Sequence, residues 1–159
     1  MTVKYRRATA TDAAAIADLV EGSYAHYVPV IGLRPAPMDA DYASMVGALP
    51  VWVADLDGSL VGVIVMEVAA DHLLVDNVAV APGSQGLGIG SRLLAIAEDE
   101  ARSAGLDELR LFTHVLMTDN IAYYARRGYV ETHRRAERGF SRVFFSKSLG
   151  PCEAGLSTT

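Results

Sequence analysis

Residues 78–91 join an apolar strand pattern to a dense run of glycines, a combination suited to holding phosphate. The stretch passes from Val78 through Pro82 to Gly86, Gly88 and Gly90. Because glycine has no Cβ, a ligand can approach the backbone closely, and the first amides of a following helix donate to anions. The sequence therefore predicts a phosphate-binding turn, and an ordinary glycine-rich turn between a strand and a helix is the alternative.

Two common phosphate motifs do not fit this spacing. A nucleotide P-loop requires a lysine and then Ser or Thr after its last glycine, but Gly90 is followed by Ser91 and Arg92. A dinucleotide fingerprint would require a glycine at Ser91 or Leu93. The spacing thus argues against both classes of nucleotide site.

A second pattern with residues that could do chemistry lies at residues 120–129. Asn120 and Tyr124 are four residues apart in a segment with a helical pattern that ends at Gly128. Two side chains at this spacing share one face of a helix, one turn apart. One surface can therefore present both an amide and a phenol to a ligand.

The composition limits the classes of protein to consider. The chain has 159 residues, 51% of them hydrophobic, which predicts one domain over residues 1–149 with a flexible tail at 150–159. A net charge of −5 disfavours nucleic-acid and anionic-lipid partners. The N-terminus lacks an apolar signal core and no uncharged apolar run reaches about 20 residues, so we expect a cytoplasmic protein with no membrane partner. Cys152 is the only cysteine, and no Cys/His pair has metal-ligand spacing, so we expect no metal.

Helix and strand signals alternate along the whole chain. A capping box at Thr9–Asp12 begins the first helix, and Asp57-Gly58 indicates a hairpin. We expect a loop at Val28–Pro37, a second helix from Met38 or Asp39 to Ala48, a helix from the glycine turn to Gly105 and a short helix at Asp119–Arg127. The predicted strands are Val3–Arg7, Val51–Leu56, Leu60–Val68, Leu73–Val80, Leu109–His114, Tyr129–Thr132 and Arg142–Ser148.

These motifs, in this order, resemble the GNAT superfamily of N-acetyltransferases. The first is Gln85-x-x-Gly88-x-Gly90 after the strand ending at Val80, and the second is the helix of Asn120 and Tyr124 that ends in Gly-Tyr. In the second motif the spacing after Ala122 is shorter than the family pattern. The resemblance implies an α/β (α+β) GNAT fold, with a mixed, largely antiparallel sheet of about seven strands flanked by four helices. It also implies acetyl-CoA as cosubstrate and an amine acceptor.

The resemblance also implies how the chain would bind acetyl-CoA. The family's pyrophosphate loop corresponds to Gln85, Gly86, Leu87, Gly88, Ile89, Gly90 and Ser91. Backbone groups of Val78, Ala79 and Val80 would hold the pantetheine arm and polarise the thioester carbonyl. Asn120 and Tyr124 would also contact the cofactor, and Tyr124 would be the general acid beside the sulfur. A core tyrosine is the alternative reading of Tyr124.

The general base is less defined. The position of the family's usual glutamate corresponds to Leu74, which cannot accept a proton. Alignment of the fifth strand places His114 where a related group has a glutamate, and a neutral histidine is a competent base. His114 is therefore the candidate base and a substrate contact, against the alternative of a plain buried histidine. Asp76, Glu67, His72, a water relay or no base at all remain open.

We expect the first two helices and the loop between them to bind the acceptor. This segment offers Tyr24, Tyr27, Arg34, Met38 and Tyr42 as substrate contacts. Asp41 could hold an ammonium group and Arg34 a carboxylate, or both could be solvated while Tyr27 and Met38 lie in the core.

The sequence thus predicts an N-acetyltransferase that acetylates a primary amine of a small molecule or of a peptide or protein N-terminus, by direct attack in a ternary complex. The alternative is a non-catalytic acyl-CoA-binding regulatory module of the same fold. The final strands fit either pairing across a two-fold axis in a homodimer or pairing inside one chain.

Overall fold

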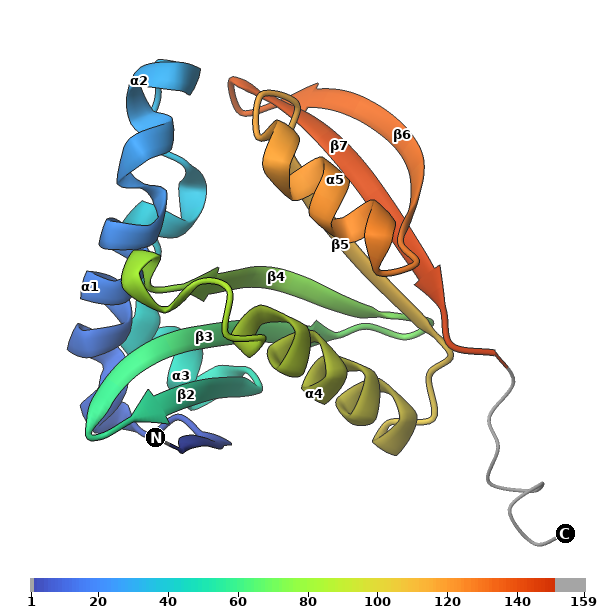
Figure 1. The fold of residues 1–159 in the computed structure, drawn as a ribbon. Helices are drawn as coiled ribbons and strands as arrows, with labels where there is room; N and C mark the ends of the chain where they lie inside the picture. Colours follow the sequence, from blue (N-terminus) through green and yellow to red (C-terminus); the bar gives the residue numbers. More distant parts are fainter. Residues whose placement is uncertain (1, 151–159) are drawn as a thin grey trace, which may run out of the picture. The chain divides into compact units, whose positions relative to one another are not determined.

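The computed structural model describes residues 2–150, with seven strands and five α-helices in that range (Figure 1). The elements are β1 (Val3–Arg7), α1 (Ala13–Tyr24), α2 (Val28–Ile31), α3 (Tyr42–Ala48), β2 (Val51–Leu56), β3 (Ser59–Val68), β4 (Leu73–Val80), α4 (Ile89–Ser103), β5 (Glu108–His114), α5 (Thr118–Arg126), β6 (Val130–Glu137) and β7 (Phe140–Ser148). Their order in the sheet is β1-β2-β3-β4-β5-β7-β6, with parallel and antiparallel pairs. The predicted mixed sheet of seven strands is confirmed. Four of the helices have seven or more residues, and α2 is a single turn.

The described residues form two compact units. The first comprises residues up to 67 together with 76–96, and the second comprises residues 68–75 and 97 onward. Strand β4 and helix α4 each contribute residues to both units. The predicted single domain at residues 1–149 stays a prediction. Cys152 and the predicted tail, apart from Gly150, lie outside the described residues.

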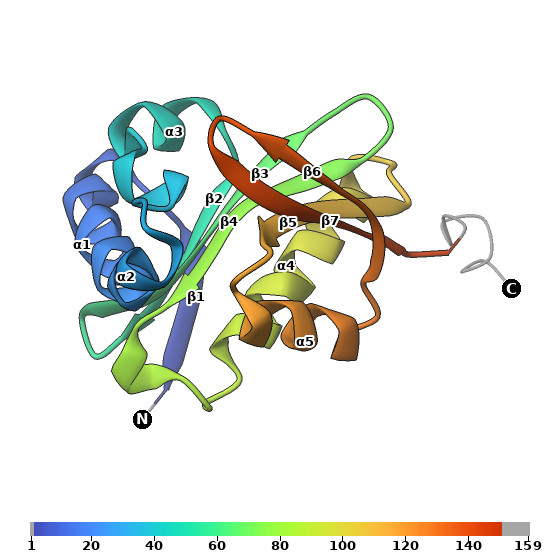
Figure 2. The same ribbon diagram turned by 90° about the horizontal axis from the view of Figure 1, so that it is seen from above.

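The first unit is built on the antiparallel strands β1, β2 and β3. The predicted hairpin is confirmed: Asp57 and Gly58 have φ values of 54° and 85°, as a tight turn between twisted strands requires. Helices α1 and α3 cover one sheet face through a buried cluster that includes Ile16, Val20, Tyr42, Val53 and Val63. Figure 2 shows α4 on the other side of these strands. The two layers hold the end of β4 and the start of α4 in place.

The second unit is built on β5 and β7. In this unit β4 pairs with β5 in parallel over Leu73–Val75, while β7 lies antiparallel between β5 and β6. Helix α5 covers the sheet face that carries the buried side chains Val143 and Phe145, and the ring of Tyr124 contacts Phe145. Because β7 has a partner on both sides, it is an internal strand, which the sequence had left open. A homodimer stays a prediction.

The region between α1 and β2 differs from the sequence prediction. The expected loop contains α2, because Pro29 stands in the first turn, where a missing amide costs nothing, and Gly32 ends the helix at φ 82°. The second helix begins at Tyr42 and not at Met38 or Asp39. A 3-10 turn occupies Ala36–Asp39, and Asp41 then caps α3 by accepting from the Ser44 amide at 3.2 Å.

The boundaries of the last two strands were predicted incorrectly. Strand β6 continues to Glu137 and β7 begins at Phe140, because Arg138 and Gly139 make a tight turn with φ values of 54° and 80°. Helix α4 ends at Ser103, close to the predicted end at Gly105. Within residues 2–150, no helix is both long enough and apolar enough to cross a membrane.

Candidate functional site

The glycine segment 85–90 forms the turn that leads into α4. A short 3-10 turn at Pro82–Ser84 follows β4, and Gly86 and Gly88 then adopt φ values of 85° and 80°. Only glycine enters this left-handed region without strain. The Arg92 amide donates to the Gly88 carbonyl at 3.1 Å. The amides just before Arg92 belong to the first turn of α4, where amides have no acceptor within the helix. The start of a 15-residue helix thereby offers donors and a positive dipole end to an anion.

The start of α4 rests on a glycine that the sequence analysis did not identify. A Cβ built at Gly62 in β3 would lie 2.8 Å from Ile89 Cγ2 and 3.0 Å from Leu93 Cδ1. Both side chains are buried, and they belong to the first turns of α4. The missing side chain at Gly62 therefore lets α4 approach the sheet. A glycine inside a strand was the available signal in the sequence.

The end of β4 turns alternate peptide groups toward its two edges. The Ala81 amide donates to the Val61 carbonyl in β3 at 2.8 Å, so the peptide groups of Val78 and Val80 point to the opposite edge. There α1 supplies donors: Ser23 Oγ donates to the Val80 carbonyl at 2.7 Å and the Tyr24 hydroxyl lies 3.3 Å from the Val78 carbonyl. Side chains of α1 thus fix the backbone that was predicted to hold a pantetheine arm.

Asn77 connects this strand to two predicted substrate residues. Its side chain is buried, accepts from the Tyr24 hydroxyl at 2.8 Å and donates to the Tyr42 hydroxyl at 3.0 Å. The Tyr42 hydroxyl donates in turn to the Pro37 carbonyl at 2.6 Å. Burial raises the pKa of Tyr42 well above its usual range. This network of Tyr24, Asn77 and Tyr42 was not found from the sequence, because its members lie far apart along the chain.

The charged residues that were considered for the acceptor have partners within the first unit. Arg34 donates to Glu21 at 2.9 Å and to Asp39 at 3.0 Å, so two carboxylates already balance its charge. Asp41 is engaged as the cap of α3. Met38 packs against the core, as does the partly buried Tyr24. Tyr27 lies beside His26, with ring centroids 3.9 Å apart.

In the second unit, Tyr124 lies on the face of α5 that meets the sheet. It is 8% exposed, and its ring makes an edge contact with Tyr129 at 5.7 Å between centroids. Its carbonyl accepts from the amides of Arg127 and Tyr129 at 3.0 and 3.1 Å, so α5 ends before Gly128, which adopts a φ of 89°. Asn120, one turn earlier, places its amide nitrogen 3.4 Å from Thr113 Oγ1 in β5.

His114 stands at the end of β5. Its Nδ1 accepts a hydrogen bond from the Leu116 amide at 3.1 Å, so the proton of the neutral ring is on Nε2. Burial, and then the nearby charge of Arg142, lower the pKa of His114. The ring is therefore neutral near pH 7, but in this conformation its basic nitrogen is engaged and its free nitrogen is a donor.

Tyr129 carries a polar group without a partner. Its side chain is 3% exposed, and among the described residues its hydroxyl is buried with no hydrogen-bond partner. Burial is also the main cause that raises its pKa far above the usual value. The ring packs against Tyr124 on one side, and Lys147 Nζ lies 5.6 Å from its centroid.

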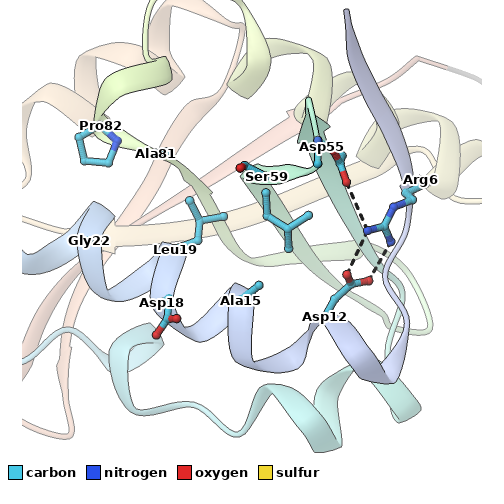
Figure 3. Close-up of a pocket in the computed structure, with 12 residues that line it drawn as sticks. Arg6, Asp12, Ala15, Asp18, Leu19, Gly22, Asp55, Ser59, Ala81 and Pro82 are labelled. Carbon is cyan, nitrogen blue, oxygen red and sulfur yellow. Dashed lines mark hydrogen bonds and ion pairs between the residues drawn. The ribbon is translucent and has the colours of Figure 1, made fainter.

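A pocket of about 580 Å³ lies in the first unit between α1 and the β2–β3 turn (Figure 3). Three charged residues of its lining contact one another. Arg6 donates to both carboxylate oxygens of Asp12, at 2.8 and 3.0 Å, and lies 3.6 Å from Asp55. Each of these three charged side chains therefore has a partner of opposite sign within the pocket.

Comparisons with known proteins identify the family and the fold. Residues 18–129 match the acetyltransferase (GNAT) family. Over 61 residues the chain is 41% identical to an aminoalkylphosphonate N-acetyltransferase of Salmonella typhimurium, covering 38% of this chain and 40% of that protein. Over 81 residues it is 38% identical to an IAA acetyltransferase of Azospirillum brasilense, covering 50% and 53%. The chain thus matches about half or less of the length of these curated relatives.

One solved structure is similar to this chain over almost the whole length of both proteins. The PaiA N-acetyltransferase of Thermoplasma acidophilum, in complex with coenzyme A, has a TM-score of 0.79 at 16% identity, covering 93% of this chain and 99% of that one. At this identity the likeness shows the fold. Together with the family match over residues 18–129, it shows that the chain belongs to the acetyltransferase (GNAT) family.

Proposed function

We propose that the protein is an acetyl-CoA-dependent N-acetyltransferase that acetylates the primary amine of a small molecule or of a peptide end by direct attack in a ternary complex. The observation that carries this proposal is the left-handed turn at Gly86 and Gly88 that opens directly onto the first amides of α4. Such a helix start suits a pyrophosphate. The similar PaiA structure contains coenzyme A, and the two curated relatives are named as acetyltransferases, which supports the choice of ligand.

In the proposed complex, the amides of residues 85–91 bind the pyrophosphate. The peptide groups of Val78 and Val80, which point to the edge of β4 away from β3, bind the pantetheine arm and polarise the thioester carbonyl. Ser23 donates to the Val80 carbonyl, and the Tyr24 hydroxyl lies 3.3 Å from the Val78 carbonyl while donating to Asn77. In this proposal the amides of Val78 and Val80 are the donors to the oxyanion. Asn77 is the residue that fixes Tyr24 for this task.

The reaction forms a bond between the amine nitrogen and the acetyl carbon and breaks the bond between that carbon and sulfur. The nitrogen loses a proton, and the coenzyme A thiolate gains one from the hydroxyl of Tyr124. The edge contact with Tyr129 and the packing against Phe145 would hold the Tyr124 ring in one orientation. Asn120, on the same helix face, would contact the cofactor.

The base in this proposal is His114 or the solvent. To accept a proton at Nδ1, His114 would have to release the Leu116 amide, which is a local change in a turn. His72 is held by Asp71 at 2.7 Å, which makes that fallback less suitable. An α-amine has a pKa near 8 and already has a neutral fraction at pH 7, so proximity can supply much of the rate without a base.

The central experiment measures thermal stabilisation and thiol release with the purified protein. Acetyl-CoA should raise the melting temperature, since a ligand bound only by the native state stabilises it, and ATP should not. A Gly88→Ala variant should lose most of this shift, because alanine is strained at φ 80° although space for its Cβ is open. An unchanged melting temperature with saturating acetyl-CoA would refute the proposal.

The catalytic role and the regulatory alternative are separated by turnover. An enzyme should release coenzyme A thiol when a suitable amine is added, whereas a regulatory module should bind acetyl-CoA without release. Tyr124→Phe should reduce kcat and leave acetyl-CoA affinity nearly unchanged. Tyr123→Phe is the matched control, since Tyr123 is the neighbouring residue and its ring packs under Arg127 at 3.5 Å. Equal losses in both variants would indicate structural roles.

A further inference from the structure

The second unit has a sheet face that combines aromatic rings with arginines. Side chains of neighbouring strands alternate between two faces, and α5 covers the one with Val143 and Phe145. Figure 2 shows α5 on one side of β5, β7 and β6. The opposite face carries Phe112 and His114 from β5, Phe140, Arg142 and Phe144 from β7, and His133, Arg135 and Glu137 from β6. We call this set the arginine face.

Arg142 is at the centre of the arginine face. Its guanidinium carbon lies 4.4 Å from the centroid of Phe112 and 5.4 Å from that of Phe140. Its side chain is only 12% exposed, and it donates to Glu137 at 2.8 Å. A guanidinium held over aromatic rings and largely removed from water interacts strongly with an anion.

Arg135 lies opposite Arg142 in the neighbouring strand and is more exposed. Its guanidinium carbon lies 4.6 Å from the centroid of Phe144, and its Nη2 is 3.3 Å from the same Glu137. The ring of His133 stacks on Phe144 at 4.4 Å with planes 3° apart. The aromatic surface therefore limits the orientations that Arg135 can adopt.

The charges of the arginine face do not balance. Two guanidinium groups share one carboxylate, that of Glu137, whose pKa is lowered mainly by its hydrogen bond from Arg142. His114 adds no charge near pH 7, because burial and Arg142 lower its pKa. The three ionised groups that meet here thus leave one positive charge, on a chain whose net charge is −5.

We infer that the arginine face selects the acceptor, and that the acceptor is a small amine that carries an anionic group, a carboxylate or a phosphonate. This inference rests on the proposed acetyltransferase function. Arg135 binds the anion through its exposed guanidinium, while Arg142 and the rings fix its position. His114, the candidate base, lies on the same face, where it is paired with Arg142 in the register of β5 and β7.

The test compares matched pairs of amines that differ only in charge. One pair is an amino acid and its carboxamide, and the other is an aminoalkylphosphonate and the corresponding amino alcohol. We expect kcat/KM at least tenfold higher for the anionic member of one pair, and the pair that shows it identifies the anion. In Arg135→Gln this preference should fall close to onefold, with the KM for acetyl-CoA unchanged. Equal kcat/KM within both pairs would overturn the inference.

Arg134 provides the control on the same strand. It is paired with Val143 and so projects from the other face, where it donates to Glu131 at 2.8 Å. Arg134→Gln should keep the full preference for the anionic amine, and an equal loss in both variants would indicate a general effect on β6. Isothermal titration of the anionic amines into both variants tests the face even without turnover. If acetyl-CoA causes no thermal shift but the anionic amine binds and Arg135→Gln abolishes binding, the proposed function fails and the arginine face stands.

Discussion

The Gly62→Ala substitution tests whether the close approach of α4 to β3 sets the position of the glycine turn. The added Cβ would meet Ile89 Cγ2 at 2.8 Å, Leu93 Cδ1 at 3.0 Å and the Ala54 Cβ at 3.2 Å. Carbon atoms prefer separations of about 3.5–4.0 Å, so α4 or the sheet must move by several tenths of an ångström. Because Ile89 is the first residue of α4, the displacement falls on the helix start.

The expected loss of stability follows from two opposing effects. Overpacking a core typically costs about 1–3 kcal/mol. Replacing glycine by alanine in a strand regains about 0.5–1 kcal/mol, since the unfolded chain has less freedom to lose. Central values of these two ranges leave a net cost of about 1 kcal/mol, and for a chain of this size the melting temperature should fall by about 2–4 °C. The KM for acetyl-CoA should rise severalfold because the helix amides move.

Urea unfolding and steady-state kinetics with acetyl-CoA measure the two effects. Gly22→Ala in α1 is the control, because a Cβ there meets nothing within 4 Å and the helix should gain up to about 1 kcal/mol. Ile89→Ala removes the nearest methyl group, so the double variant with Gly62→Ala should be less destabilised than the sum of the single variants by at least about 0.5 kcal/mol. A Gly62→Ala protein with wild-type stability and KM, or strictly additive effects, would refute the reasoning.

Three further predictions concern buried polar groups. The bond from Arg6 lowers the pKa of Asp12 to about 2, below its unfolded value near 3.9, so the resulting stability, about 2 kcal/mol, is complete above about pH 5 and is lost as the pH falls toward 2. Asp12→Asn should flatten the free energy of urea unfolding over this range, whereas Asp18→Asn on the exposed side of α1 should keep the wild-type slope. Tyr129→Phe removes a buried hydroxyl without a partner and should raise the free energy of unfolding by about 1 kcal/mol, and a lower melting temperature would show that the hydroxyl has a partner. Tyr42→Phe should cost about 1–3 kcal/mol in denaturant unfolding, because it deprives Asn77 of an acceptor, and a raised KM for the amine at normal stability would instead support Tyr42 as a substrate contact.

Local patterns in the sequence were sufficient to predict the elements around the glycine turn. An apolar run predicted β4, and the backbone demands of Asp57-Gly58 predicted the hairpin, because each signal depends on adjacent residues. Strand β6 was predicted only in part. It is an edge strand and nearly all of its side chains are exposed, so it lacks the alternation that reveals a half-buried strand.

The candidate site was less predictable, because much of it depends on contacts between distant segments. Gly62 and Ile89 are 27 residues apart along the chain, and the Asn77 network joins α1, α3 and β4. A single sequence does not indicate such pairs. For His114, the residue type predicted a neutral ring, but the hydrogen bond to Nδ1 depends on how the chain turns after β5. The catalytic roles of Tyr124 and His114, the cytoplasmic location and the homodimer stay predictions.

The position of β7 has a consequence for the order in which the chain can fold during synthesis. This strand is the last of the seven to leave the ribosome, yet it must enter between β5 and β6, both of which are made earlier. Until Ser148 has emerged, the hydrogen-bonding edge of β5 that β7 will occupy has no strand beside it, which is a site for faulty pairing with other chains. We therefore expect that stalled or shortened chains ending at Gly139 aggregate, while chains ending at Gly150 remain monodisperse.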